Sequence, residues 1–119
     1  MNRSERASQI WAVLAYAASN RQSLTYRQLG RLIGVPAAGL GNLLEPIQSY
    51  CMREELPPLT VLVVQQESGL PGSGFTAATA QEFAQAQSRV FAFDWLKHGN
   101  PQPEKLEAAV AALLSNGAA

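Results

Sequence analysis

The chain has 119 residues, of which 47% are hydrophobic and 15% are charged, a composition typical of one folded globular domain and not of a disordered segment. Nine basic and nine acidic side chains give a net charge of zero, which argues against a strong nonspecific nucleic-acid binder. No apolar run approaches the roughly 20 residues of a membrane span, the N-terminal residues lack the apolar core of a secretory signal, and the single cysteine cannot form an internal disulfide. We therefore expect a cytoplasmic protein with no membrane contact.

The charges are distributed unevenly along the chain. Residues 1–53 carry six arginines and two glutamates, a net charge of +4, whereas residues 54–119 carry a net charge of −4. A basic half can meet phosphates, but arginines also simply solvate helix faces, and both interpretations stay open.

Residues 4–20 have apolar side chains at helical spacing, which predicts a first helix. Its inward face is expected to contain Ile10, Val13, Leu14 and Ala17, with Trp11 at the flank.

The next segment, residues 25–44, has the pattern of a helix-turn-helix. Thr25 and Gln28 have the spacing of a capping box, in which two side chains satisfy the free N–H groups at a helix start. Gly34 suits a left-handed helix end, and Pro36 suits the first turn of a second helix that reaches Leu44. The apolar face of the first of these helices is expected to contain Leu29, Leu32 and Ile33.

After the helix-turn-helix we expect one more helix and one strand. The helix restarts at Pro46 and ends before Pro57. It should turn Ile47, Tyr50 and Cys51 inward. Residues 59–64 form the only clear strand, because they are β-branched and nearly all apolar, so the strand is buried on both faces. A turn follows at 65–69, and residues 70–75 are so rich in Gly and Pro that they suit an edge strand or loop.

Two further helices complete the chain. Thr79 and Glu82 form a second capping box, which opens a helix to about His98. Residues 99–101 break this helix, and Pro103 starts the last one. The apolar residues of the two helices are Phe83, Ala86, Val90, Phe91, Phe93, Trp95, Leu96, Leu106, Val110, Leu113 and Leu114.

These elements predict a mainly α fold with a small β-hairpin (α+β). We expect a single domain over residues 1–119, with a winged helix-turn-helix core at about residues 4–75 and a helical C-terminal extension at about residues 79–116.

The segment Thr25–Leu29, the Gly-rich second helix, and Leu56-Pro57-Pro58 before a Val-rich strand resemble the winged-helix DNA-binding domain of alkylguanine-DNA alkyltransferases and alkyltransferase-like proteins. The resemblance covers roughly residues 8–75. It implies that Tyr26 contacts a DNA phosphate, as the family's tyrosine does at this position. The family's arginine, which fills the gap left by a flipped base, is matched by about Ala38, which cannot do so. The Pro-Cys-His-Arg motif, which carries the alkyl-accepting cysteine, falls on residues 58–62, which contain no cysteine, histidine or arginine.

The sequence shows no catalytic or metal-binding group. Cys51 lies on an apolar helix face, where it is expected to be a small core residue. His98 ends a helix, where it is expected to interact with terminal carbonyls, and one histidine with one cysteine makes no metal site. Glu54, Glu55 and Glu67 are spaced as surface charge and not as an acid–base pair. We therefore expect a protein that is not an enzyme and has no cofactor.

Two classes of function remain, and the first is a non-catalytic winged-helix protein that binds double-stranded DNA in repair, defence or regulation. Tyr26, Arg27 and Arg31 would touch phosphates while the second helix enters the major groove. That helix would present Ala38 and Asn42, of which only Asn42 can hydrogen-bond to a base edge. Binding would therefore be weakly sequence-selective. The uneven distribution of arginines favours this class.

The second class is a winged-helix-shaped protein–protein interaction module, accessory to a DNA-processing enzyme. The docking surface would be the small residues of the second helix together with the loop at residues 69–75. The neutral net charge favours this class.

Overall fold

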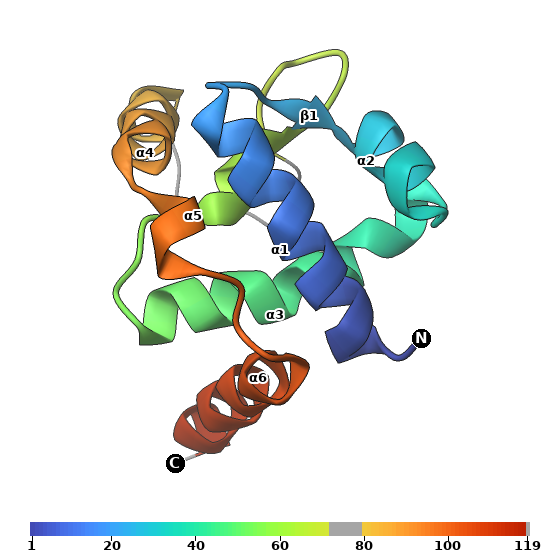
Figure 1. Cartoon of the computed structure of the whole chain (residues 1–119), viewed down its shortest axis with the longest axis vertical. Coiled ribbons are helices and arrows are strands. Elements are labelled where there is room, and N and C mark those ends of the chain that lie inside the picture. The colour runs from blue at the N-terminus through green and yellow to red at the C-terminus, as the bar shows by residue number, and fades with distance from the viewer. Residues whose placement is uncertain (72–79, 119) are drawn as a thin grey trace.

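The computed structural model of the chain describes residues 1–71 and 80–118, which form a mainly helical fold with one small sheet (Figure 1). Helices α1, α3 and α6 lie across one another, α4 and α5 cover one side, and α2 lies at the opposite side beside the sheet. In chain order the elements, with 3₁₀ helices written η, are α1 (Arg3–Ser19), β1 (Leu24–Thr25), α2 (Tyr26–Ile33), η1 (Ala37–Gly39), α3 (Leu40–Arg53), η2 (Leu59–Leu62), β2 (Val63–Val64), α4 (Ala80–Ala92), α5 (Trp95–His98) and α6 (Pro103–Ala118).

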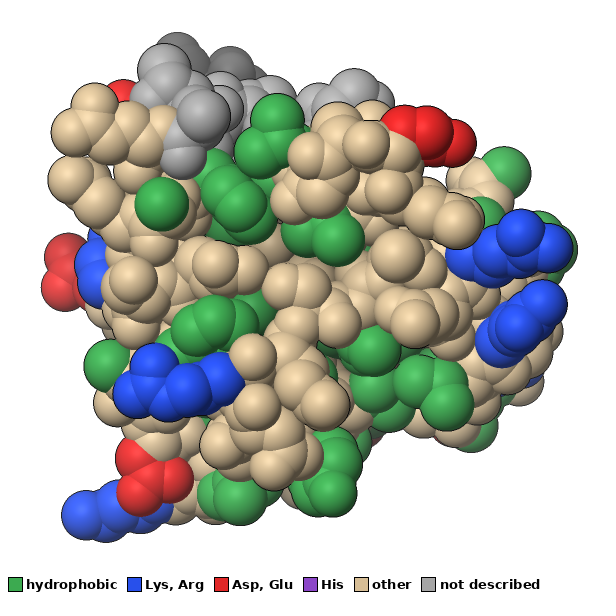
Figure 2. Space-filling view, turned by 90° about the horizontal axis from the view of Figure 1, so that it is seen from above, with side chains coloured by type: hydrophobic (Ala, Val, Ile, Leu, Met, Phe, Trp, Pro, Cys, Tyr) green, Lys and Arg blue, Asp and Glu red, His purple; other side chains and the backbone are tan. Residues whose placement is uncertain are grey.

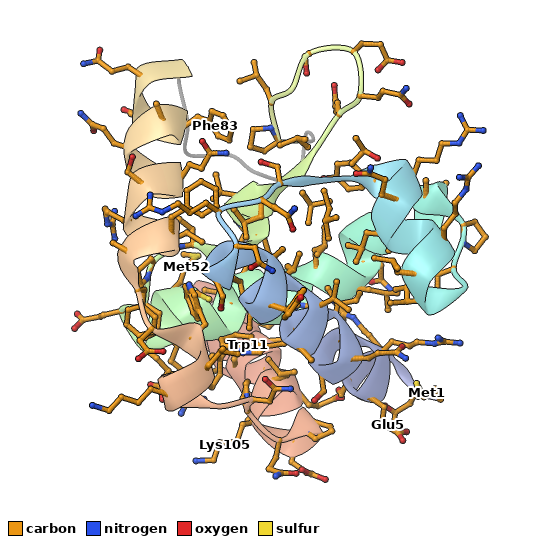
Figure 3. The ribbon with its side chains drawn as sticks, turned by 45° about the horizontal axis from the view of Figure 1, so that its top comes forward. Met1, Glu5, Trp11, Met52, Phe83 and Lys105 are labelled. Atoms are coloured by element: carbon orange, nitrogen blue, oxygen red, sulfur yellow. The ribbon has the colours of Figure 1, made fainter. Side chains whose placement is uncertain are left out.

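The first helix forms the centre of the core, because α1 packs against α3, α5, α6 and η2. Ile10 and Leu14 are fully buried as predicted. Trp11, predicted at the flank, is also fully buried, and Figure 3 shows it among the helices. Its ring makes edge contacts with Tyr50 and Trp95 at centroid distances of 5.5 and 5.6 Å. Trp11 therefore joins α1 to α3 and to α5 at the centre of the core.

Helix α2 begins and ends as its sequence predicts. The Thr25 hydroxyl accepts from the Gln28 N–H at 3.0 Å, and the Gln28 side chain accepts from the Thr25 N–H at 2.9 Å. Gly34 closes the helix in the left-handed region, with φ at 74°. The capping box and the left-handed end are confirmed.

The inward face of α2 differs from the prediction at one position. Leu29 and Ile33 are buried, but Leu32 is 64% exposed, and Gly30 is buried in its place. A Cβ atom at residue 30 would lie 2.5 Å from the carbonyl oxygen of Val35. The helix is therefore rotated so that its glycine lies against the following turn, and Leu32 is turned to solvent.

The predicted second helix over residues 36–44, with a restart at Pro46, is wrong. Residues 37–39 form the 3₁₀ turn η1, and α3 then runs without interruption from Leu40 to Arg53 with Pro46 inside it. The expected end before Pro57 is confirmed, and so is the burial of the three inward residues Ile47, Tyr50 and Cys51.

The predicted strand at residues 59–64 is mostly wrong, although the burial predicted for it is confirmed at every position. Residues 59–62 form η2, which packs against α1, α3 and α4. Only Val63 and Val64 form a strand, and they pair in parallel with Leu24 and Thr25 of β1. An apolar run can be buried as a strand or as a 3₁₀ helix. Packing against three helices selected the 3₁₀ helix here.

The small sheet is therefore parallel, and the predicted hairpin is described only where its two segments begin to pair. Antiparallel pairing within the described residues is a single bridge between Val64 and Pro71, which follows a turn closed by the Gln65 N–H on the Leu70 carbonyl at 2.8 Å. Residues 72–75 of the predicted edge strand lie outside the described residues.

The C-terminal part contains one more break than predicted. The helix predicted to reach His98 ends at Ala92, and α5 then starts at Trp95 because the Asp94 side chain accepts from the Lys97 N–H at 3.1 Å. Thr79, half of the second predicted capping box, lies outside the described residues. The break at residues 99–101 and the helix start at Pro103 are confirmed.

The C-terminal helices add to the core that α1 and α3 form. Trp95, Val90 and Leu106 are buried in it. Leu96, Leu113 and Leu114, which were among the apolar residues of the predicted helices, are 64%, 46% and 66% exposed. In the part of the chain that the structure describes, no helix combines the length and apolar character needed to cross a bilayer.

Candidate nucleic-acid interface

Two arginines lie side by side on the outward face of α2. Arg27 and Arg31 are one helical turn apart, both are exposed, and within residues 1–71 and 80–118 neither guanidinium forms a hydrogen bond or an ion pair. Figure 2 shows basic side chains gathered at the edge of the molecule where α2 lies. The pair is therefore free to meet an external anion.

The two arginines border an open hollow of about 450 Å³. The hollow lies beside the turn that joins α2 to η1. Its lining residues are Arg27, Gly30, Arg31, Gly34, Val35, Pro36 and Ala37. Apart from the arginines, no lining side chain carries a charge. The hollow combines two cations with an otherwise uncharged lining, which suits the approach of a phosphate.

The other arginines near this face bind the protein itself. Arg6 is half-buried, and its guanidinium donates to the carbonyl of Ile33 at 2.6 Å, which satisfies an acceptor at the end of α2. Arg3 donates to a carbonyl of α3 and pairs with Glu45. Of the four arginines, Arg27 and Arg31 therefore face solvent without a partner among the described residues, and the other two hold helices together.

Tyr26 is not on the outward face with the arginines. It is the first residue of α2, it is half-buried, and its ring packs against the core. Its hydroxyl has no hydrogen-bond partner among the residues that the structure describes. The structure thus brings Arg27 and Arg31 together and leaves Tyr26 on the neighbouring side of the helix.

Ala38 and Asn42 are both exposed, at the start of the segment expected to approach DNA. Ala38 lies in η1, and Asn42 lies in the first turn of α3. Between them, a Cβ atom at Gly41 would meet nothing within 4 Å. Packing inside the protein therefore does not require glycine at this position. Because residue 41 has no side chain, the backbone there is directly accessible.

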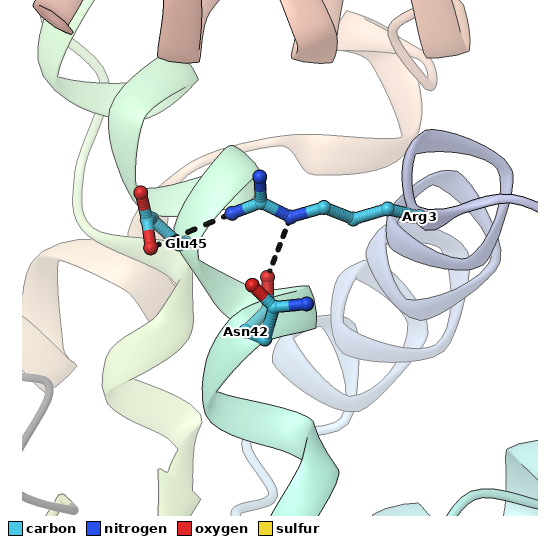
Figure 4. Close-up of polar contacts among 3 residues, drawn as sticks. All are labelled: Arg3, Asn42 and Glu45. Atoms are coloured by element: carbon cyan, nitrogen blue, oxygen red, sulfur yellow. Dashed lines mark hydrogen bonds and ion pairs between the residues drawn. The ribbon is translucent and has the colours of Figure 1, made fainter.

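Arg3, which the sequence analysis did not single out, acts on this same segment. Its Nε donates to the Asn42 carbonyl at 2.9 Å, and its Nη2 lies 3.4 Å from Oε2 of Glu45 (Figure 4). The sequence feature that points to this contact is Pro46, because a proline leaves the carbonyl four residues before it without a helical donor. That feature does not say which residue supplies the donor.

Neither the single cysteine nor the single histidine lines the hollow beside α2. Cys51 is buried, and burial raises the pKa of its thiol to about 12 even though a backbone hydrogen bond from Leu59 lowers it. A thiol with so high a pKa stays protonated near neutral pH and is a poor nucleophile. His98 lies 2.8 Å from the Gly99 carbonyl through Nδ1, which confirms the expected contact at a helix end.

Glu54, Glu55 and Glu67 are exposed, as predicted for surface charge. Within the described residues, no three His, Cys, Asp or Glu side chains lie close enough together to hold a metal ion.

No protein-family model, curated protein or solved structure matches this chain.

Proposed function

We propose that this protein binds double-stranded DNA without catalysis, as a winged-helix protein of the alkyltransferase-like type. The observation that carries the proposal is the pair formed by Arg27 and Arg31, exposed and without a partner among the described residues, on one face of α2 beside an open hollow. Long-range attraction between such cations and phosphates supplies most of the affinity of sequence-independent DNA binding.

In this proposal α2 positions the protein and the following segment approaches the bases. Arg27 and Arg31 contact phosphates, and four exposed small residues let the backbone come close to a groove: Ala37, Ala38, Gly39 and Gly41. Asn42 is the one side chain of the small-residue segment at residues 37–42 that can hydrogen-bond to a base edge, so sequence selectivity is weak. The half-buried Tyr26 offers its hydroxyl to a phosphate at the edge of this surface.

We expect no alkyl transfer because of the burial and the raised pKa of the single cysteine. Cys51 is buried with a raised pKa, and residues 58–62 offer no other thiol. DNA carrying a labelled methylguanine should therefore keep its label after incubation with the protein. Stoichiometric label on Cys51 would disprove this part of the proposal.

A mobility-shift titration with duplex DNA tests the proposal directly. We expect micromolar-range affinity at about 50 mM salt and a steep loss as salt rises, because each neutralised phosphate releases counterions. The double variant R27A/R31A should weaken binding similarly on all sequences and lower the salt slope by about 1.8, at about 0.9 per phosphate contact.

The matched control is R89A/K97A, which also removes two exposed positive charges but from α4 and α5. It should leave both the affinity and the salt slope close to those of the wild type. Equal losses in the two double variants would show that net charge, and not the face of α2, governs binding.

A second candidate function is a protein–protein interaction module, and a specific surface favours it. An apolar groove of about 340 Å³ lies between α3 and α6, with Met52 and Leu113 in its lining and both side chains exposed. This groove is not the surface expected from the sequence, which combined the small residues of the second helix with the loop at residues 69–75. Residues 72–75 of that loop lie outside the described part. Absence of any DNA shift, with a partner recovered by wild type and lost by M52D/L113D, would favour this function.

A further inference from the structure

Helix α3 continues through a proline that removes one of its hydrogen bonds. Pro46 has no N–H, so the carbonyl of Asn42, four residues earlier, lacks its helical donor. A proline inside a helix commonly kinks or ends it. In this protein Leu40–Arg53 remains one helix, and the free carbonyl has a donor from outside the helix.

That donor is the guanidinium of Arg3, on a different helix. Arg3 Nε donates to the Asn42 carbonyl at 2.9 Å, and Arg3 Nη2 reaches Glu45 Oε2 at 3.4 Å (Figure 4). One side chain therefore replaces the missing N–H and pairs with the carboxylate that directly precedes the proline. An ionised donor makes a stronger hydrogen bond than the neutral N–H that it replaces.

The backbone that carries Arg3 is itself fixed. Asn2 and Glu5 form a reciprocal capping box, in which the Asn2 side chain accepts from the Glu5 N–H at 2.8 Å and Glu5 accepts from the Asn2 N–H at 3.2 Å. Arg3 is the first residue of α1, directly inside this box. The guanidinium therefore reaches α3 from an ordered helix start, at a lower entropic cost than from a free chain end.

We infer that Arg3 is a positioning residue for the first turns of α3, whose exposed residues Gly41 and Asn42 the proposed function turns toward DNA. It keeps the first turns of α3 aligned with the rest of the helix, and it neutralises Glu45, a 52% exposed carboxylate close to Asn42 that would otherwise repel phosphates. The consequence for DNA rests on the proposed function. The hydrogen bond from Arg3 to the carbonyl freed by Pro46 does not depend on the proposed function.

A double-mutant cycle between Arg3 and Pro46 tests the link. In P46A, the new N–H can donate to the Asn42 carbonyl, so Arg3 becomes dispensable there. We expect R3A to lower the folding equilibrium constant about fivefold with Pro46 present, the usual size for one hydrogen bond. In the P46A background, the loss should be about twofold or less, from the exposed ion pair with Glu45 alone.

A second measurement does not depend on P46A folding. The carbonyl ¹³C resonance of Asn42 should move upfield in R3A, because that carbonyl loses its donor, and R3K should restore part of the shift. An unchanged Asn42 resonance in R3A, or equal effects of R3A in the wild-type and P46A backgrounds, would overturn the link.

DNA binding by the same variants tests the positioning role. R3A should weaken binding several-fold. R3A/P46A should recover the part of this loss that comes from the alignment of the helix start, whereas the part that comes from the unpaired Glu45 should remain. If R3A/P46A binds as weakly as R3A, holding the helix start in line contributes nothing to DNA binding and the positioning role is refuted. If wild type binds no DNA, the proposed function and this role fail together, whereas the stability cycle still decides the link to Pro46.

Discussion

Replacing Gly41 by alanine should stabilise the fold and weaken DNA binding at the same time. Gly41 is exposed in the first turn of α3, and a Cβ atom there would meet nothing within 4 Å. Alanine also removes the entropic disadvantage of glycine in a helix. Packing within the protein gives no reason for glycine at this position, but the close approach of a DNA backbone would.

The size of the effect can be worked out by comparison with Gly30. G41A should add about 0.5 kcal/mol to the free energy of unfolding and raise Tm by about 2 °C. G30A makes the same chemical change, but its Cβ would lie 2.5 Å from the backbone oxygen of Val35. Such overpacking costs about 1–3 kcal/mol, so G30A should lower Tm by about 2–10 °C after its helix gain of about 0.5 kcal/mol.

Thermal unfolding followed by circular dichroism gives the stabilities, and mobility-shift titration gives the affinities. An added methyl between two closely packed backbones should cost about 1 kcal/mol, or about fivefold in Kd. Ser88, exposed on α4, supplies the control, since S88A also replaces a poorer helix former and should leave DNA affinity unchanged. If G41A binds DNA as tightly as wild type, the start of α3 does not face DNA and the reasoning fails.

Three further predictions concern the thiol and two helix caps. Burial raises the pKa of Cys51 from 9.0 to about 12. The stability that the protonated Cys51 thiol contributes is therefore complete below pH 9 and is lost as pH rises toward 12. In urea titrations, the difference in unfolding free energy between wild type and C51A should narrow over that range. T25A should lower the unfolding free energy by about 1 kcal/mol, because Gln28 loses its reciprocal partner, and T25S should restore most of it. D94A should cost a similar amount by freeing the Lys97 N–H, and D94N should cost much less; equal losses in these two variants would rule out the cap as the cause.

The features that the sequence predicted correctly depend on neighbours within a few residues. The capping box of Thr25 and Gln28, the left-handed end at Gly34 and the helix start at Pro103 were all predicted. Hydrogen bonds over three residues and the restricted backbone of glycine and proline act whatever the rest of the chain does. Helical spacing alone likewise placed Arg27 and Arg31 together, and both are exposed in the structure.

The tertiary structure decided the features that depend on distant partners. Pro46 predicted a break in the helix, but Arg3, brought there by the packing of α1 on α3, supplies the missing donor. The apolar run Leu59–Val64 predicted burial correctly but not its backbone form, because packing against three helices selected a 3₁₀ coil. Burial of Gly30 in place of Leu32 was set by the turn that follows α2. In each case the local pattern allowed two conformations, and contacts with segments outside that pattern selected one.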